Sequence, residues 1–339
     1  MRVGAFVLAA QFPGQGQGEA LHRAVRTAEV AEEAGLDSVW LAEHHFVPYG
    51  VCPSAVTLAA LLLGRTRRLR VGTAVSVLPS THPVTLGEQA ALLHVTSGGR
   101  FTLGVGRGGP WVDLEVFGGG LDAYENGFPA DLDLVRRWLS EPRVAAAGTR
   151  YGFREVAVVP RPSEALDGDG KGPEVIVACT SPASVRLAAE RGLPMLLGMH
   201  CGDEDKAEMV ALWRRTARAA GHHPEAGHVS AGVCQLADRT ADARETLLKA
   251  MPGWFRQGLD AHVTVDGRQR AMRDPVAYTE LLCDLHPVGT PELAADRLAA
   301  TAERTGIGRF ALLTEGSGDL AATEENVRRL GAEVLPRLG

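Results

Sequence analysis

The sequence predicts an α/β protein that forms one (β/α)8 TIM barrel with insertions. Short β-rich runs alternate with helical patterns along almost all of the 339 residues. Most of these runs are continuously apolar, without period-2 alternation, as parallel strands buried on both faces should be. Eight strand–helix units favour the barrel, and a doubly wound open sheet is the alternative.

The expected elements follow one another in regular order. Strands are expected at residues 2–8, 37–41, 69–77, 101–106, 174–179, 194–199, 229–236 and 309–314. Helices are expected at residues 19–34, 54–63, 82–95, 182–191, 204–220, 241–250, 291–305 and 320–335. Pro182 opens one of these helices and Gly192 follows it, which is the usual asymmetry of helix ends.

Two long stretches interrupt the alternation within what we expect to be a single domain spanning residues 1–339. We place insertions at about residues 143–173, which contain "DGDGKG", and at about residues 253–290, which contain "DGRQRAMRDP". Long excursions of this kind usually serve as lids, binding loops or disordered segments.

Composition narrows the class of protein. With 45% apolar and 22% charged residues, the chain suits a soluble globular protein with a full core. A net charge of −6 argues against general affinity for nucleic acid or anionic membranes. No apolar run is long enough to cross a bilayer. The five scattered cysteines lack a C-x-x-C pair and favour reduced thiols in the cytoplasm.

The stretch "VWLAEHHF" places Glu43, His44 and His45 at the carboxyl end of the second strand. Barrel enzymes carry catalytic residues there, although a strand that simply ends at the surface gives the same pattern. Adjacent residues in extended chain point to opposite faces, so the two histidines cannot readily share a metal, and no metal site is expected. We expect one imidazole to lie in the wall and the other to face the mouth, where it titrates near neutral pH and transfers protons.

Phosphate recognition is indicated at two further strand ends. The run "GVGRGG" matches G-x-G-x-x-G but closes the fourth strand, so it indicates only a close backbone approach beside Arg107. After the fifth strand, Thr180 and Ser181 precede Pro182, and a helix N-terminus at a barrel mouth binds anions. An arginine, two hydroxyls and a helix start on neighbouring strands therefore suggest a phosphorylated cofactor. Glu315, after the eighth strand, is also expected at the mouth.

Several stretches resemble one known family, in order along nearly the whole chain. They are "EEAGLDSVWLAEHHF", "LRVGTAVSVLPSTHPV", "GGRFTLGVGRG", "EVFGG", "SPASVRLAAERGLPMLL" and "HPVGTP". In combination they resemble the bacterial luciferase-like flavin-dependent monooxygenases, and most closely the luciferase α-subunit branch of that family.

The resemblance implies a (β/α)8 barrel that uses FMN as FMNH2, supplied by a separate flavin reductase, with O2 as co-substrate. It implies that His44 is the catalytic histidine and assists proton transfer around a flavin C4a-hydroperoxide. The Ala74–Val75 bond matches a non-proline cis peptide beneath the isoalloxazine ring. Arg107, Ser181 and Ser184 match the family's phosphate-binding positions.

The chain also departs from the luciferase pattern. Gly106 stands where the α subunit has a reactive cysteine, which is expected to widen the pocket and to remove a thiol. The aromatic residue usually found beyond Arg107 is replaced by Gly109-Pro110, and the region between Trp254 and His286 is shorter. These changes argue against long-chain aldehyde oxidation and strong light emission but leave the flavin chemistry intact.

The leading hypothesis is a two-component monooxygenase that inserts one oxygen atom into an organic, apolar or aromatic substrate by hydroxylation, epoxidation or Baeyer–Villiger chemistry. A deazaflavin-dependent hydride-transfer enzyme and a non-catalytic flavin-binding protein are the alternatives. The substrate candidates at the mouth are Phe46, Trp111, Met199 and Trp254. Helices 54–63 and 83–95 lack a polar face, and by analogy with the family we expect a homodimer packed through them.

Overall fold

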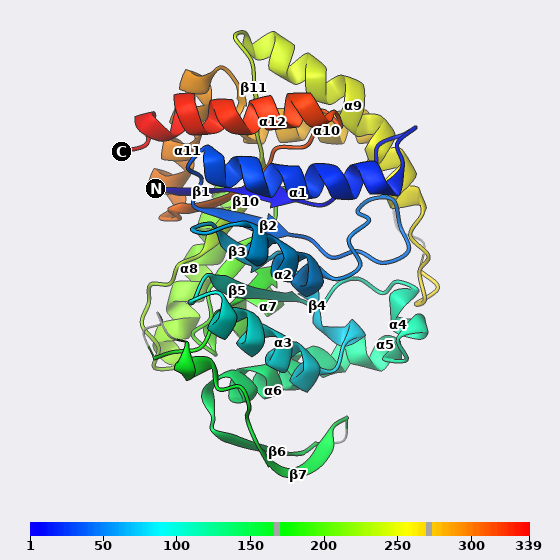
Figure 1. Cartoon of the computed structure of the whole chain (residues 1–339), viewed down its shortest axis with the longest axis vertical. Coiled ribbons are helices and arrows are strands. Elements are labelled where there is room, and N and C mark those ends of the chain that lie inside the picture. The colour runs from blue at the N-terminus through cyan, green and yellow to red at the C-terminus, as the bar shows by residue number, and fades with distance from the viewer. Residues whose placement is uncertain (149, 166–169, 269–272) are drawn as a thin grey trace.

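The computed structural model describes residues 1–148, 150–165, 170–268 and 273–339. Its centre is a ring of parallel strands surrounded by helices (Figure 1). The strands follow the order β3-β2-β1-β13-β10-β9-β8-β5, and β3 pairs with β5 to close the ring. The expected (β/α)8 barrel is confirmed, and the open sheet is wrong. The ring consists of β1 (Arg2–Val7), β2 (Ser38–Leu41), β3 (Arg70–Thr73), β5 (Phe101–Gly106), β8 (Glu174–Cys179), β9 (Met195–Leu197), β10 (Val229–Val233) and β13 (Arg309–Leu313).

Helices form the outer layer of the barrel (Figure 1). They are α1 (Gln17–Glu33), α2 (Ala55–Arg65), α3 (Pro83–Thr96), α6 (Phe128–Ser140), α7 (Pro182–Ala189), α8 (Asp203–Ala219), α11 (Pro291–Thr305) and α12 (Leu320–Arg329). Within the described ranges, no helix has the length and apolarity needed to cross a bilayer.

Additional helices and short strands lie outside the eight-stranded barrel and its outer helices. The antiparallel hairpin of β6 and β7 extends from the barrel inside the first expected insertion (Figure 1). The remaining elements are β4 (Ser76–Val77), α4 (Asp113–Val116), α5 (Gly120–Asp122), β6 (Arg143–Ala147), β7 (Gly152–Ala157), β11 (Gln235–Leu236), α9 (Thr240–Asp260), α10 (Pro275–Leu285) and β12 (Val288–Gly289).

Three of the longer helices, α6, α9 and α10, differ from the expectation. No helix was expected at α6, although Phe128, Leu132 and Leu139 repeat at helical spacing and are buried. The expected helix 241–250 continues to Asp260 as α9 and contains Pro252. Its buried face persists on both sides of the proline, so packing compensates for the hydrogen bond that proline removes.

The second insertion, expected at residues 253–290, therefore begins inside α9 and contains α10 and β12. Of the two stretches that mark the insertions, residues 167–169 of "DGDGKG" and residues 269–272 of "DGRQRAMRDP" lie outside the described residues.

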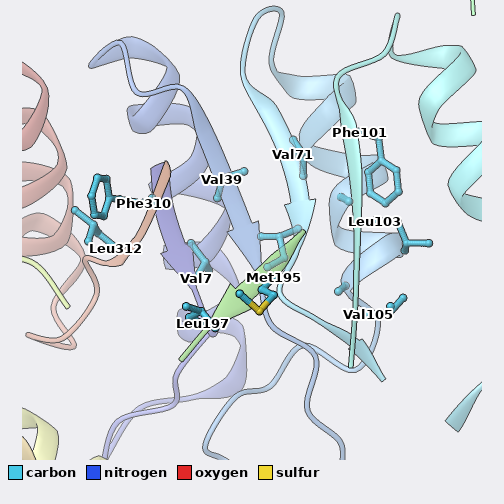
Figure 2. Packing of buried hydrophobic residues seen from close by; sticks show 14 of the residues in the cluster. Val7, Val39, Val71, Phe101, Leu103, Val105, Met195, Leu197, Phe310 and Leu312 are labelled. Atoms are coloured by element: carbon cyan, nitrogen blue, oxygen red, sulfur yellow. The ribbon is translucent and has the colours of Figure 1, made fainter. Parts of the chain in front are cut away.

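Strand residues are buried on both faces of the sheet, as the apolar runs predict. In β1, Val3, Ala5 and Val7 pack in the cluster that also contains the inner faces of the helices, whereas Phe6 packs in a second cluster. Figure 2 shows the first cluster, with side chains from neighbouring strands in contact along the sheet. This double burial accounts for the absence of polar alternation in the strands.

All five cysteines are buried and unpaired. Burial raises the pKa of the Cys52 and Cys283 thiols to about 11, and that of Cys179 and Cys234 to about 12. The pKa of Cys201 is raised for the same reason. The thiols are therefore protonated at neutral pH.

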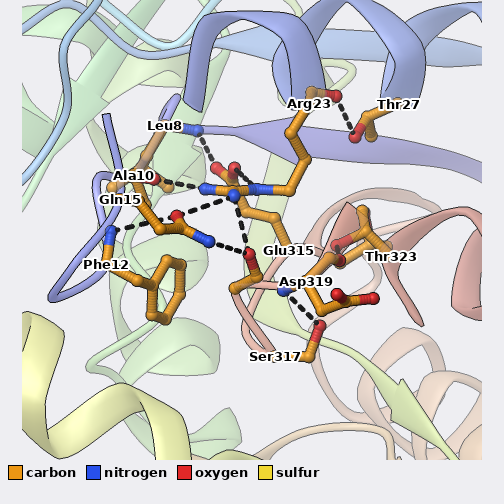
Figure 3. Close-up of polar contacts among 12 residues, drawn as sticks. Leu8, Ala10, Phe12, Gln15, Arg23, Thr27, Glu315, Ser317, Asp319 and Thr323 are labelled. Atoms are coloured by element: carbon orange, nitrogen blue, oxygen red, sulfur yellow. Dashed lines mark hydrogen bonds and ion pairs between the residues drawn. The ribbon is translucent and has the colours of Figure 1, made fainter. Parts of the chain in front are cut away.

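A buried ion pair joins the first and last units of the barrel (Figure 3). Glu315 follows β13 at the carboxyl end of the strand, as expected, but its side chain is buried: it accepts the backbone N–H of Leu8 at 2.7 Å and the Arg23 Nε–H at 3.3 Å. The Arg23 guanidinium also donates to Gln15 at 3.0 Å and to the Gly318 carbonyl at 2.7 Å. Burial raises the pKa of Glu315, and the Arg23 charge opposes that shift.

We predict that Arg23→Met destabilises the protein by about 3–5 kcal/mol, because it leaves the Glu315 carboxylate buried without its counter-charge. Urea unfolding followed by circular dichroism measures the loss. Arg26→Met on the same helix is the matched control, since its pair with Glu324 is partly exposed and contributes less than about 1 kcal/mol. Equal losses in the two variants would contradict the prediction.

Candidate active site

A cavity of about 800 Å³ opens at the carboxyl ends of β2, β3 and β5. This is the rim at which TIM-barrel enzymes carry their active sites. One wall comes from the barrel and the other from residues 259–268, which we call the cover segment. The lining residues are Ala42, Glu43, His44, His45, Tyr49, Ala74, Val75, Val77, Gly108, Gly109, Trp111, Asp113, Leu259, Asp260, His262, Thr264 and Arg268.

The imidazole of His44 faces this cavity as a neutral group. It meets Tyr49 edge-on, with ring centroids 5.0 Å apart at 90°. Burial, with smaller contributions from the neighbouring His262 and His45, lowers the pKa of His44 to about 3. The expectation that a histidine at the mouth titrates near neutral pH is therefore wrong for His44, because burial among its neighbours disfavours the charged form of the ring.

The two ring nitrogens of His44 differ in environment. Nδ1 is buried without a hydrogen-bond partner among the described residues, and a Cβ on Gly50 would lie 2.7 Å from it. Buried N–H groups without an acceptor are rarer than under-used acceptors. We therefore assign the proton to Nε2, the nitrogen left to face the cavity.

Glu43 and His45 complete the turn after β2. The Glu43 carboxylate accepts the backbone N–H groups of Ala55 and Val77, each at 2.9 Å, and so links β2 to α2 and β4. His45 Nε2 lies 3.7 Å from the same carboxylate without a hydrogen bond. Both histidines line the cavity, rather than one alone. Among the described residues, no group of three His, Cys, Asp or Glu side chains could hold a metal ion.

The backbone after β3 has the geometry that the resemblance implies. The Ala74–Val75 peptide bond is cis, and both residues line the cavity. Gly106 on β5 does not line the cavity, and a Cβ added there would lie 2.4 Å from Val75 Cγ2. The expectation that Gly106 widens the pocket is therefore wrong, because the Val75 side chain fills the space that a cysteine would need.

The structure places Arg107 and the start of α7 at adjacent strand ends. Arg107 follows β5, Thr180 and Ser181 follow β8, and these strands pair through Val105 and Val177. The Arg107 guanidinium is exposed and lies 4.2 Å from the centroid of the Tyr124 ring. It has no ion pair or hydrogen bond to the residues that the structure describes, so it can bind an anion.

The N-terminus of α7 is capped as expected. Ser181 Oγ accepts the Ser184 N–H at 3.3 Å, and Ser184 Oγ accepts the N–H groups of Ser181 and Thr180 at 3.1 and 3.2 Å. These residues and Arg107 lie outside the lining of the large cavity. They form a separate polar group beside it.

Of the four substrate candidates, the structure brings only Trp111 into the cavity lining. Phe46 is 59% exposed and stacks on Phe117 with centroids 6.0 Å apart. Met199 and Trp254 are core residues. Trp254 stacks on Tyr49 at 4.9 Å and donates from Nε1 to the Tyr49 carbonyl at 3.0 Å, so it supports the cavity wall from behind.

The cover segment lies in the second expected insertion, for which a lid or binding loop was one expectation, but none of its residues was predicted to line the site. Its backbone pairs antiparallel with the loop after β5 through two hydrogen bonds of 2.9 Å, Val112 N–H to Val263 and Val265 N–H to Pro110. This pairing brings His262 and Thr264 to the cavity. No local pattern predicts it, because about 150 residues separate the two segments.

The fold is that of a TIM-barrel enzyme, and its candidate active site lies at the carboxyl rim. A family model described as luciferase-like monooxygenase matches residues 1–309. The chain therefore belongs to the luciferase-like monooxygenase family and is a flavin-dependent monooxygenase. The resemblance seen in the sequence motifs is confirmed.

Individual relatives agree with this assignment. The chain is 28% identical over 356 residues to the alkanal monooxygenase alpha chain of Photorhabdus luminescens, covering 100% of this chain and 97% of the relative. It is similar to the crystal structure of monooxygenase RslO1 from Streptomyces bottropensis, with a TM-score of 0.85, 26% identity and full coverage of both chains. The oxygenating constituent of 3,6-diketocamphane monooxygenase from Pseudomonas putida, in complex with FMN, shares the fold, with a TM-score of 0.76, 21% identity and coverage of 100% and 99%.

We predict that Gly106→Cys destabilises the protein by about 1–3 kcal/mol through overpacking against Val75, and that adding Val75→Ala removes most of this cost. Urea unfolding of the wild type, both single variants and the double variant forms a double-mutant cycle. A coupling energy near zero would contradict the assignment of Val75 as the residue that fills this space.

Proposed function

We propose that the chain is the oxygenating component of a two-component system. It would receive FMNH2 from a separate flavin reductase and insert one oxygen atom of O2 into an apolar or aromatic organic substrate by hydroxylation, epoxidation or Baeyer–Villiger chemistry. The observation that carries the proposal is the buried His44 in the same cavity as Ala74 and Val75, next to the strand end that carries Arg107, which has no ion pair among the described residues. The unpaired cysteines fit a reducing compartment, which supports a cytoplasmic location.

The residues present fit FMN. The backbone of Ala74 and Val75 offers a cavity wall for the flavin ring, and the glycines that follow Arg107 let the backbone approach closely. Arg107, with the Thr180, Ser181 and Ser184 helix start, would hold the phosphate by charge-assisted hydrogen bonds. When bound, reduced FMN supplies the reaction with O2 and the transfer of one oxygen atom.

The chain's own contribution is to donate a hydrogen bond and to exclude water. A neutral His44 with its proton on Nε2 donates a hydrogen bond toward the cavity and adds no positive charge there. The rings of Tyr49 and Trp111, together with the cover segment, form the wall that separates the reacting groups from solvent.

We predict that reduced FMN, mixed with oxygenated buffer in a stopped-flow spectrometer, reoxidises at least tenfold more slowly with saturating protein than without it. His44→Ala should accelerate reoxidation, because the Nε2 hydrogen bond is lost. The exposed His223 provides the control His223→Ala, which should behave as wild type. Because the pKa of His44 is about 3, His44 should not titrate near pH 6.5. The pH dependence of the reoxidation rate around pH 6.5 should therefore be the same in the wild type and in His44→Ala.

Reoxidation as fast with the protein as without it would contradict the oxygenase proposal. Binding of a deazaflavin would then favour the hydride-transfer alternative, and flavin binding without turnover would favour a non-catalytic flavin-binding protein. Arg107→Ala should weaken FMN binding about tenfold whether or not oxygen is activated, because it removes a charge-assisted contact to the phosphate.

We also propose a homodimer packed through α2 and α3. Leu61 on α2 is 47% exposed and Leu92 on α3 is 52% exposed, and the two helices are neighbours in the outer layer. Exposed leucines on adjacent, largely apolar helices fit a self-complementary interface with a second copy.

The dimer proposal predicts that Leu61→Glu combined with Leu92→Glu yields a monomer, because two charges would be buried on each side of the interface. Size-exclusion chromatography with light scattering gives the mass of each protein. Leu281→Glu on α10 is the control at a similarly exposed leucine. A monomeric wild type would contradict the proposal.

A further inference from the structure

We propose that the cavity takes an aromatic substrate that carries a hydroxyl group, and that Nε2 of His262 accepts the hydrogen bond from that hydroxyl. This inference rests on the proposed function for the cofactor and assigns the substrate class of the same site. It depends on three features of the wall that carries His262: the state of its ring, the aromatic neighbours and the charge nearby.

Hydrogen bonding fixes which nitrogen of His262 is the acceptor. Nδ1 lies 3.3 Å from the backbone oxygen of Leu259. A carbonyl oxygen only accepts hydrogen bonds, so Nδ1 carries the proton and Nε2 is left with a lone pair. Nε2 has no hydrogen-bond partner within the described part of the chain. Burial lowers the pKa of His262, so the ring is neutral and Nε2 is free to accept.

The neighbours of His262 are aromatic. The Trp111 ring lies 4.7 Å from the His262 ring, and the Tyr49 ring lies 6.2 Å from it, centroid to centroid. Tyr49 is held parallel to the buried Trp254 at 4.9 Å, with an interplanar angle of 3°. A planar substrate ring can stack or pack edge-on against this wall, and such contacts add to the gain from burial.

The barrel side of the cavity carries the polar side chains Glu43, His44 and His45, and of these His44 presents a donor, the proton assigned to Nε2. Ala42, Val75 and Val77 line it with aliphatic side chains. The cover segment supplies the acceptor: the His262 ring lies next to the rings of Trp111 and Tyr49, where an aromatic substrate would pack.

A carboxylate stabilises the imidazole when it receives a proton. Asp113 lines the cavity, is 5% exposed and accepts the Ser80 hydroxyl at 2.8 Å through Oδ2. Its Oδ1 is buried without a hydrogen-bond partner among the described residues. The Asp113 charge opposes the lowering of the His262 pKa, so it favours a proton on Nε2. If the hydroxyl proton passes to Nε2, the O–H bond breaks, the N–H bond forms, and the oxygen keeps the electron pair.

An aldehyde would not use this group. A simple alkanal has a carbonyl oxygen that accepts hydrogen bonds and has no hydroxyl donor, whereas Nε2 of neutral His262 has only a lone pair. The His262 wall therefore favours a hydroxylated aromatic molecule, whereas an aldehyde oxygen could accept only from a donor such as the Nε2–H of His44. A site built to bond a hydroxyl strongly rejects the analogue that lacks it.

Isothermal titration calorimetry on the full chain tests the inference with three probes: 2-naphthol, its methyl ether 2-methoxynaphthalene, and decanal. We expect the wild type to bind 2-naphthol about tenfold more tightly than the ether, the gain of one hydrogen bond in a partly closed site. In His262→Phe the two naphthalenes should bind equally. His262→Gln keeps an acceptor oxygen and should retain part of the preference, and His223→Phe should retain all of it.

Equal binding of 2-naphthol and the ether by the wild type would overturn the inference. So would tighter binding of decanal, or a preference unchanged in a folded His262→Phe variant. A parallel FMN titration of the wild type reports on the cofactor by itself. If the wild type prefers 2-naphthol to its ether but does not bind FMN, the proposed function is refuted and the substrate class is not. If it binds FMN but shows no preference for 2-naphthol, only the substrate class is refuted.

Discussion

Closure of one parallel sheet into a ring is the constraint on which the active site depends. Because β3 pairs with β5 as well as β2, the carboxyl ends of all strands in the ring meet at one rim. Two carboxylates join distant parts of the chain around that rim. Glu43 holds the backbone of α2 and β4 against β2, and Glu315 holds the loop after β1 through Leu8 and Arg23. These two carboxylates therefore tie the loops of the rim to the barrel.

The sequence predicts well the features whose signal is local. Continuous apolar strands, the Ser181–Pro182 helix start and the histidine pair after β2 all lie where their patterns indicate. The expected end of the helix 241–250 is wrong because the proline rule is local, whereas the apolar face of α9 is held by tertiary packing across Pro252. Helix α6 carried a readable apolar repeat that the sequence interpretation overlooked.

Features that depend on contacts between distant segments could not be predicted. The cover segment pairs with the loop after β5 only because the barrel brings both to the same rim. The neutral state of His44 and the inward pairing of Glu315 depend on burial, which residue type alone does not reveal. The role of Gly106 likewise depends on its neighbour, since Val75 decides how much room that position offers.

The burial of every cysteine affects how well the enzyme resists oxidation during its own catalytic cycles. Reduced flavin that meets oxygen without a substrate releases hydrogen peroxide, which attacks thiolates rather than protonated thiols. With all five sulfurs buried and their pKa values raised, the protein exposes no thiolate to this by-product. Wasted cycles then cost the cell reducing equivalents and do not inactivate the enzyme through its own cysteines.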